Sequence, residues 1–244
     1  MRSVLVLQKQ LENSLVEIHK RRREAVWRAV EGLIAGGKLW LTALGRSLPG
    51  RTADKHRIKA ADRLLGNQAI HDSVRLFYRA LATRLLRHTR SPIVAIDWTA
   101  GGGPQHYILS AQLCCEGRSL PLYHQVFQKQ HVGNQRLHKQ FLSELAAVIP
   151  DKCRPIIITD AGFRTPWFDA VAAFGWDFIG RIRDTTKVFT QQGWIPVKSL
   201  HVSAKTKPRD FGWMWLPRYH PREYRLVLSK RPRSKGRKRK TRSE

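Results

Sequence analysis

Two apolar stretches of the chain each run into an aspartate. Asp97 lies within PIVAIDW, and Asp160 directly follows PIIIT. Two carboxylates that are held close together repel each other, and a buried pair stays ionised only if a cation compensates the charge. Mg²⁺ and Mn²⁺ prefer carboxylate and water oxygens. Paired acids on a rigid sheet would therefore predict a metal site, whereas a single aspartate at a strand end is more often a turn former or a helix cap.

The elements around these aspartates decide between the two interpretations. We expect strands at Pro92–Trp98, His106–Cys115, Ser119–Phe127, Pro155–Thr159 and Trp176–Ile182, with helices at Asn134–Ile149 and Trp167–Phe174. The order β-β-β-α-β-α-β is that of a mixed α/β, ribonuclease-H-like sheet, in which the fourth strand pairs with the first. This topology would place Asp97 and Asp160 side by side, and it favours the metal-site interpretation.

Helical patterns dominate the first ninety residues. Residues 3–34 carry apolar side chains at helical spacing, namely Leu7, Leu11, Leu15 and Ile18. Leu41–Leu48 suits a short helix, and Thr52 or Asp54 could cap a second helix that runs through Leu65. A further helix is expected at about Ile70–His88.

The two helices on either side of Pro49-Gly50 resemble a helix-turn-helix, a motif whose second helix enters the major groove of DNA. The candidate DNA-binding residues are Arg46, Arg51, Lys55, His56, Arg57, Lys59 and Arg63. The alternative is a solvated basic helix in a small bundle.

Charge is the strongest signal in the composition. The 244 residues hold 45 Lys and Arg against 18 Asp and Glu, a formal net charge of +27. Such a chain should bind a polyanion, because each neutralised phosphate releases counterions. We expect nucleic acid first and an anionic membrane surface a distant second. No stretch is long and apolar enough to span a membrane, and three cysteines form neither a disulfide framework nor a zinc pattern. We therefore expect a cytoplasmic, nucleoid-associated protein.

Several motifs resemble one known family. LTALGRSLPGRT, DRLLGN, PIVAIDW, EGRSLPLY, DAGFRTPWF and GWDFIGRIR are similar to stretches of bacterial cut-and-paste DDE transposases, in the insertion-sequence-four family and its transposon-Tn-ten branch. The resemblance implies that Asp97 and Asp160 are the first two catalytic acids and hold Mg²⁺ or Mn²⁺. It also implies double-stranded DNA as partner, both transposon ends and target, and a homodimer in a synaptic complex. Water would cut the element end, and the released 3′-hydroxyl would open a hairpin and finally join to target DNA.

The resemblance implies a third acid that this sequence does not show. The family's glutamate lies in a signature of Tyr, Arg three positions on, Glu four after that and Lys seven beyond. Tyr219 and Arg222 have the first spacing, but position 226 is Leu and position 233 is Arg.

The sequence predicts a helical DNA-binding region at 1–90, an incomplete catalytic core at 91–184, and the start of a β-rich insertion at 185–244, with Trp194, Trp213 and Trp215 in its core. We expect the basic tail from Ser229 to be unfolded when free, and the chain to be truncated at its C-terminus.

Three functions remain open from the sequence. The first is a DNA transposase that lacks its third acid and cleaves weakly or not at all by itself. The second is a non-catalytic binder that occupies element ends and inhibits transposition. The third is a ribonuclease-H-like nuclease of another lineage, which the match of DAGFRTPWF disfavours.

Overall fold

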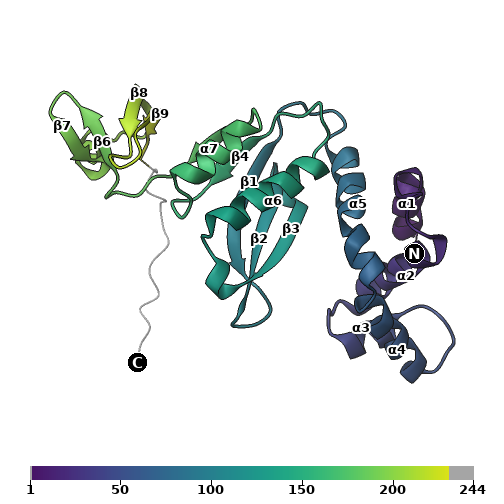
Figure 1. The fold of residues 1–244 in the computed structure, drawn as a ribbon. Helices are drawn as coiled ribbons and strands as arrows, with labels where there is room; N and C mark the ends of the chain where they lie inside the picture. The colour runs from purple at the N-terminus through teal and green to yellow at the C-terminus, as the bar shows by residue number, and fades with distance from the viewer. Residues whose placement is uncertain (1, 231–244) are drawn as a thin grey trace. The chain divides into compact units, whose positions relative to one another are not determined.

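Helices form the N-terminal part of the chain, as the periodicity predicts. The computed structural model describes residues 2–230, and its first elements are α1 (Arg2–Leu11), a 3₁₀ turn (Glu12–Leu15), α2 (Lys20–Gly36), α3 (Leu41–Ser47), α4 (Asp54–Leu65) and α5 (Gln68–Leu85) (Figure 1). The helical pattern over residues 3–34 is interrupted between Leu11 and Lys20. Its apolar stripe nevertheless continues across the break, because Leu11, Leu15 and Ile18 are buried in one cluster with Trp27.

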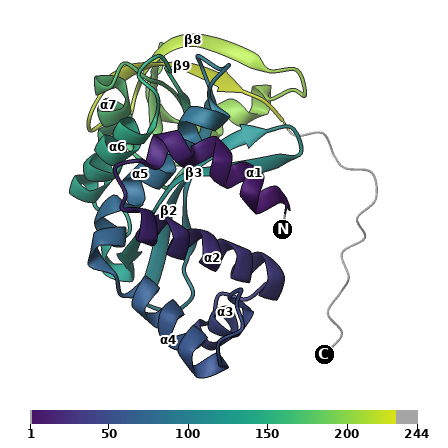
Figure 2. The ribbon, with the colours of Figure 1, turned by 90° about the vertical axis from the view of Figure 1, so that its right-hand side faces the viewer.

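The predicted helix pair is present as α3 and α4. α3 packs against both α2 and α4 (Figure 2). Gly45 permits this approach, since a Cβ there would lie 2.5 Å from the Cα of Ile58 on α4. The predicted cap is wrong: Ala53 is the N-cap residue of α4 and makes no side-chain cap bond. Asp54 lies inside the first turn, where its carboxylate accepts a hydrogen bond from Arg57 instead.

A mixed five-stranded sheet forms the middle of the chain. Its elements are β1 (Ile93–Ala100), β2 (His106–Cys115), β3 (Arg118–Gln128), α6 (Gln135–Val148), β4 (Ile156–Thr159), α7 (Thr165–Ala173) and β5 (Asp177–Gly180). The strand order is β3-β2-β1-β4-β5, and β1, β2 and β3 are antiparallel neighbours. The mixed α/β fold, the element order and the expected adjacency of the first and fourth strands are all confirmed. This arrangement is consistent with a ribonuclease-H-like core.

One face of the sheet is covered by helices. Tyr123 on β3 contacts Phe141 on α6, with ring centroids 5.3 Å apart, and makes an edge contact with Tyr78 on α5 at 5.2 Å. The periodic apolar stripe of α6 lies on its buried face. Buried residues of the strands complete the core, among them Val94, Ile96, Leu109, Ala111 and Ile157.

Short strands follow the sheet. They are β6 (Lys187–Thr190), β7 (Gly193–Pro196), β8 (Arg209–Leu216) and β9 (Arg222–Leu228), with a 3₁₀ segment at Val197–Ser203. β6 pairs with β7, and β8 pairs with β9. Contact density divides the chain into two compact units: residues 1–158 with 170–179, and residues 159–169 with the described residues from 180 onward. Nearly all of the predicted basic tail, from residue 231, lies outside the described residues.

The prediction that Trp213 and Trp215 lie in a core is wrong. Their exposed fractions are 67% and 48%. A β-bulge lies between Asp210 and Trp213, and Gly212 within it has φ +73°. The extra residue shifts the alternation of β8, so that Met214 and Leu216 pack inward and the two tryptophans face outward.

Candidate active site and nucleic-acid interface

Asp97 lies on β1 with its side chain exposed to solvent. Its sequence neighbours Ile96 and Trp98 point to the opposite face, because successive side chains of a strand alternate. The backbone N–H of Trp98 donates a hydrogen bond to Oδ1 of Asp97 at 2.8 Å. This bond fixes one carboxylate oxygen.

The side chain of Trp98 packs on the face of β1 opposite to Asp97. Its indole Nε1 donates to Nε2 of His138 on α6 at 3.2 Å, and its ring packs edge-on against Phe127 on β3. His138 is only 6% exposed. Burial lowers the pKa of the His138 imidazole to about 4, so the ring is neutral at pH 7 and its Nε2 can accept the indole proton. The spacing of His138 to Phe141 and Leu145 extends the buried stripe of α6 by one turn, and this is the signal in the sequence that indicates its burial.

Asp160 directly follows β4 and is also exposed. The backbone N–H of Gly162 donates to its Oδ1 at 2.8 Å, which forms a tight turn over DAG. Arg183 reinforces this turn, because its Nε donates to the carbonyl of Ala161 at 2.9 Å. The sequence carried Arg183 only as part of the GWDFIGRIR motif and gave it no role.

Strand order relates the two aspartates. β1 carries Asp97, and its neighbour in the sheet, β4, leads directly to Asp160. Asp97 belongs to the first compact unit and Asp160 to the second. Within residues 2–230, no group of three or more His, Cys, Asp or Glu side chains is placed to hold a metal ion.

The predicted DNA-binding residues divide into two sets. Arg46 and Arg57 are engaged within the protein: Arg46 pairs with Asp54 at 3.7 Å, and Nη1 of Arg57 donates to the carbonyl of Leu48 at 3.0 Å. The Arg57 side chain is 20% exposed, which leaves it little surface for a ligand. The other five are exposed along the α3–α4 turn and α4, and of these Arg63 donates from Nε to the carbonyl of Lys59 at 3.4 Å; the five are Arg51, Lys55, His56, Lys59 and Arg63.

A family model for the transposase DDE domain matches residues 82–243, about two thirds of the chain. The chain belongs to this family. The matched region of this DDE transposase contains the whole sheet, with both Asp97 and Asp160, and begins inside α5. Comparisons with curated proteins and with solved structures gave no match. Membership supports a transposase function, with DNA binding and DNA recombination, and such domains generally depend on divalent metal ions. No described helix is both long and apolar enough to cross a membrane.

Proposed function

We propose that Asp97 and Asp160 are the first two acids of a DDE transposase site of the insertion-sequence-four type, and that together they hold Mg²⁺ or Mn²⁺. The observation that carries this proposal is the strand order. Within the region that matches the transposase domain, two exposed aspartates lie on, or directly after, neighbouring strands.

The donor chemistry of the two residues fits such a metal. In each carboxylate, Oδ1 accepts one backbone N–H from its own turn or strand, and no hydrogen bond from the described residues reaches Oδ2. A hard cation prefers such oxygens. When bound, metal ions at such a site neutralise charge on the scissile phosphate and favour attack by a hydroxyl group. The protein's own part is to orient the carboxylates, through the N–H groups of Trp98 and Gly162 and the Arg183 side chain.

DNA is the proposed substrate, both as element end and as target. We propose that the exposed basic residues of α4 and the turn before it, with Arg46 and Arg57 supporting that turn, position the duplex. In this proposal water cuts at the element end, the released 3′-hydroxyl becomes the next nucleophile, and a homodimer holds two ends together. The proposed location is the cytoplasm, on the nucleoid.

We expect these 244 residues to cleave DNA weakly or not at all by themselves, because the sequence offers no third acid in the family's signature. The partial match near the end of the described residues supports this expectation. Tyr219 is 89% exposed, and Leu226, at the position of the expected glutamate, is buried in an apolar cluster. A second function, a non-catalytic binder that occupies element ends, is favoured by the lack of a three-acid group among residues 2–230.

Single substitutions test the metal site. Asp97→Asn and Asp160→Asn should each weaken Mn²⁺ binding by about 10-fold or more, since each removes an anionic ligand. Asp151→Asn, which changes an exposed aspartate in the turn before β4, is the matched control and should bind as the parent does. Mn²⁺ titration followed by electron paramagnetic resonance gives the affinity. Unchanged affinity in both site variants would refute the assignment.

A cleavage assay separates the two functions. The substrate is a supercoiled plasmid that carries the DNA flanking the coding sequence, incubated with the protein and Mg²⁺. Efficient nicking that Asp97→Asn abolishes would show a complete site and overturn the expectation of weak cleavage. Absence of nicking, together with preference for the flanking DNA over random duplex at ~150 mM salt in a gel shift, supports the binder.

A further inference from the structure

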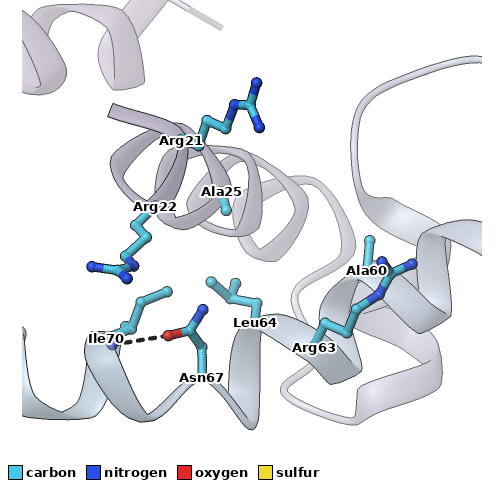
Figure 3. Close-up of a pocket in the computed structure, with 8 residues that line it drawn as sticks. All are labelled: Arg21, Arg22, Ala25, Ala60, Arg63, Leu64, Asn67 and Ile70. Carbon is cyan, nitrogen blue, oxygen red and sulfur yellow. Dashed lines mark hydrogen bonds between the residues drawn. The ribbon is translucent and has the colours of Figure 1, made fainter. Parts of the chain in front are cut away.

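The helical region contains an open pocket of about 330 Å³. Of the residues that line it, only Arg63 belongs to the predicted DNA-binding residues. Arg21, Arg22 and Ala25 of α2 line one side, Arg63 and Leu64 of α4 line the other, and Asn67 lies at the start of α5. In Figure 3 the guanidinium groups of Arg22 and Arg63 lie on either side, with Leu64 and Asn67 between them. The pocket thus has a cationic rim and an apolar floor, and no acidic side chain lines it.

The position of the two α2 arginines is unfavourable for the free protein. Lys20, Arg21, Arg22 and Arg23 form the first turn of α2, and this turn contains no acidic residue. The N-terminus of a helix carries a partial positive charge, so cations there are destabilising and anions are stabilising. An anion that binds beside these four cations would therefore stabilise this end of the helix.

Backbone carbonyls hold several arginines nearby, and Arg63 of the pocket is one of them, since its Nε donates to the carbonyl of Lys59 at 3.4 Å. Arg23 donates to the carbonyl of Glu12, and Arg28 donates to that of Pro49 at 2.9 Å. Arg21 and Arg22 are exposed, and their guanidinium groups have no hydrogen bond or ion pair with any described residue. They are available to a ligand.

Asn67 adds a neutral donor to the pocket. Its Oδ1 accepts the backbone N–H of Ile70 at 3.3 Å and so caps α5. Because the oxygen is used in this way, the amide nitrogen of Asn67 points toward the pocket (Figure 3). Guanidinium and amide donors together match phosphate oxygens.

We propose that this pocket binds the sugar–phosphate backbone of DNA. The deoxyribose lies over Ala25 and Leu64, and the flanking phosphates meet Arg21 and Arg22 on one side and Arg63 on the other. The inference rests on the proposed DNA-binding role of the helical region and extends the interface from α4 to α2. Contacts of this kind fix the position of the duplex without reading its sequence.

The test uses the full chain and three variants. Arg21→Gln/Arg22→Gln removes two rim charges, and Arg84→Gln/Arg87→Gln removes two exposed charges outside the pocket as a matched control. Asn67→Asp keeps the oxygen that caps α5 but replaces the amide donor with a negative charge, so it alters the pocket with little effect on the helix. Circular dichroism confirms folding of each variant.

Affinity for a random duplex is measured between about 50 and 200 mM salt. We expect the Arg21/Arg22 variant to lower the slope of log K against log salt by about 2, one for each lost phosphate contact, and to weaken all sequences equally. Asn67→Asp should weaken binding by about 10-fold, and the control should change the slope by less than half as much as the pocket variant. If the parent binds DNA and the pocket and control variants have equal slopes, the proposal for this pocket is wrong, while the proposed DNA-binding function stands.

Two further outcomes identify the ligand. Failure of the parent protein to bind any duplex would overturn the proposed DNA-binding function and this pocket with it. Titration with inorganic phosphate distinguishes a free anion from DNA: if Arg21→Gln/Arg22→Gln loses phosphate binding but keeps the parent's affinity for DNA, the pocket is a phosphate site and the DNA assignment is wrong.

Discussion

His138 shows at the residue scale how one buried group makes stability depend on pH. Its pKa is lowered by burial from 6.5 to about 4 in the folded protein. Between these values the unfolded chain binds a proton at this residue and the folded chain does not. The free energy of unfolding should therefore fall as pH drops below about 6.5 and level off below about 4. Because one proton is involved, the slope between these values is at most about 1.4 kcal/mol per pH unit.

The variant His138→Gln isolates this contribution. Glutamine retains an acceptor for the indole N–H of Trp98 but does not titrate, so the variant's free energy of unfolding should depend less on pH than that of the parent. Burial also lowers the pKa of His124, and this effect is common to both proteins and cancels. Urea unfolding at several pH values from about 4.5 to 7.5 measures the difference. Parallel curves would contradict the assignment.

Gly162 controls the orientation of Asp160. A Cβ at this position would lie 2.9 Å from Oδ1 of Asp160, closer than carbon and oxygen tolerate. Gly162→Ala should therefore displace the carboxylate and weaken Mn²⁺ binding by about 10-fold, as disturbed supporting contacts generally do. Gly102→Ala is the control, because its Cβ would meet nothing within 4 Å. Equal Mn²⁺ affinity in the two variants would show that the turn does not orient the ligand.

At the scale of elements, the approach of α3 to α4 depends on Gly45. Alanine is the better helix former by about 1 kcal/mol, but its Cβ would lie 2.5 Å from the Cα of Ile58 and 2.9 Å from its backbone N. Overpacking of this kind costs about 1–3 kcal/mol, so Gly45→Ala should lower the free energy of unfolding and the affinity for DNA. Gly66→Ala, whose Cβ would make an ordinary contact at 3.5 Å, should stay within about 0.5 kcal/mol. Urea unfolding of both variants measures their free energies of unfolding and tests this prediction.

The same scale shows what the sequence could and could not predict. The strands and helices between residues 92 and 182 were predictable because apolar runs, turn residues and periodicity agree there. The outward orientation of Trp213 and Trp215 was not, since a single bulged residue changes which face of β8 the side chains after it occupy. Asp160 was predictable as an acid directly after a strand, whereas Asp97 lies inside β1, which continues to Ala100. Their hydrogen bonds from Trp98 and Gly162, and the support from Arg183, depend on local backbone geometry that spacing does not encode.

For the whole molecule, the net charge of +27 predicts strong attraction to any polyanion. Charge alone would also favour an anionic membrane surface. A protein that binds such a surface firmly needs in addition an apolar face or a lipid anchor. The exposed basic residues of α4 lie on a helix pair, and our proposal assigns this pair to a DNA groove. We therefore expect the protein to bind a DNA duplex far more tightly than vesicles with anionic headgroups at the same ionic strength.

The salt dependence provides the measurement. A protein with 6–10 phosphate contacts loses about 10³- to 10⁵-fold in affinity between 50 and 200 mM salt. Arg51, Lys55, Lys59 and Arg63 together with the two α2 arginines provide six such contacts, at the lower end of this range. Fluorescence anisotropy with a labelled duplex should show a loss of about 10³-fold, and co-sedimentation with vesicles should show little binding at ~150 mM salt. Stronger binding to vesicles than to DNA would mean that the charge of this chain serves a membrane surface, and the assignment of α4 to DNA would then be wrong.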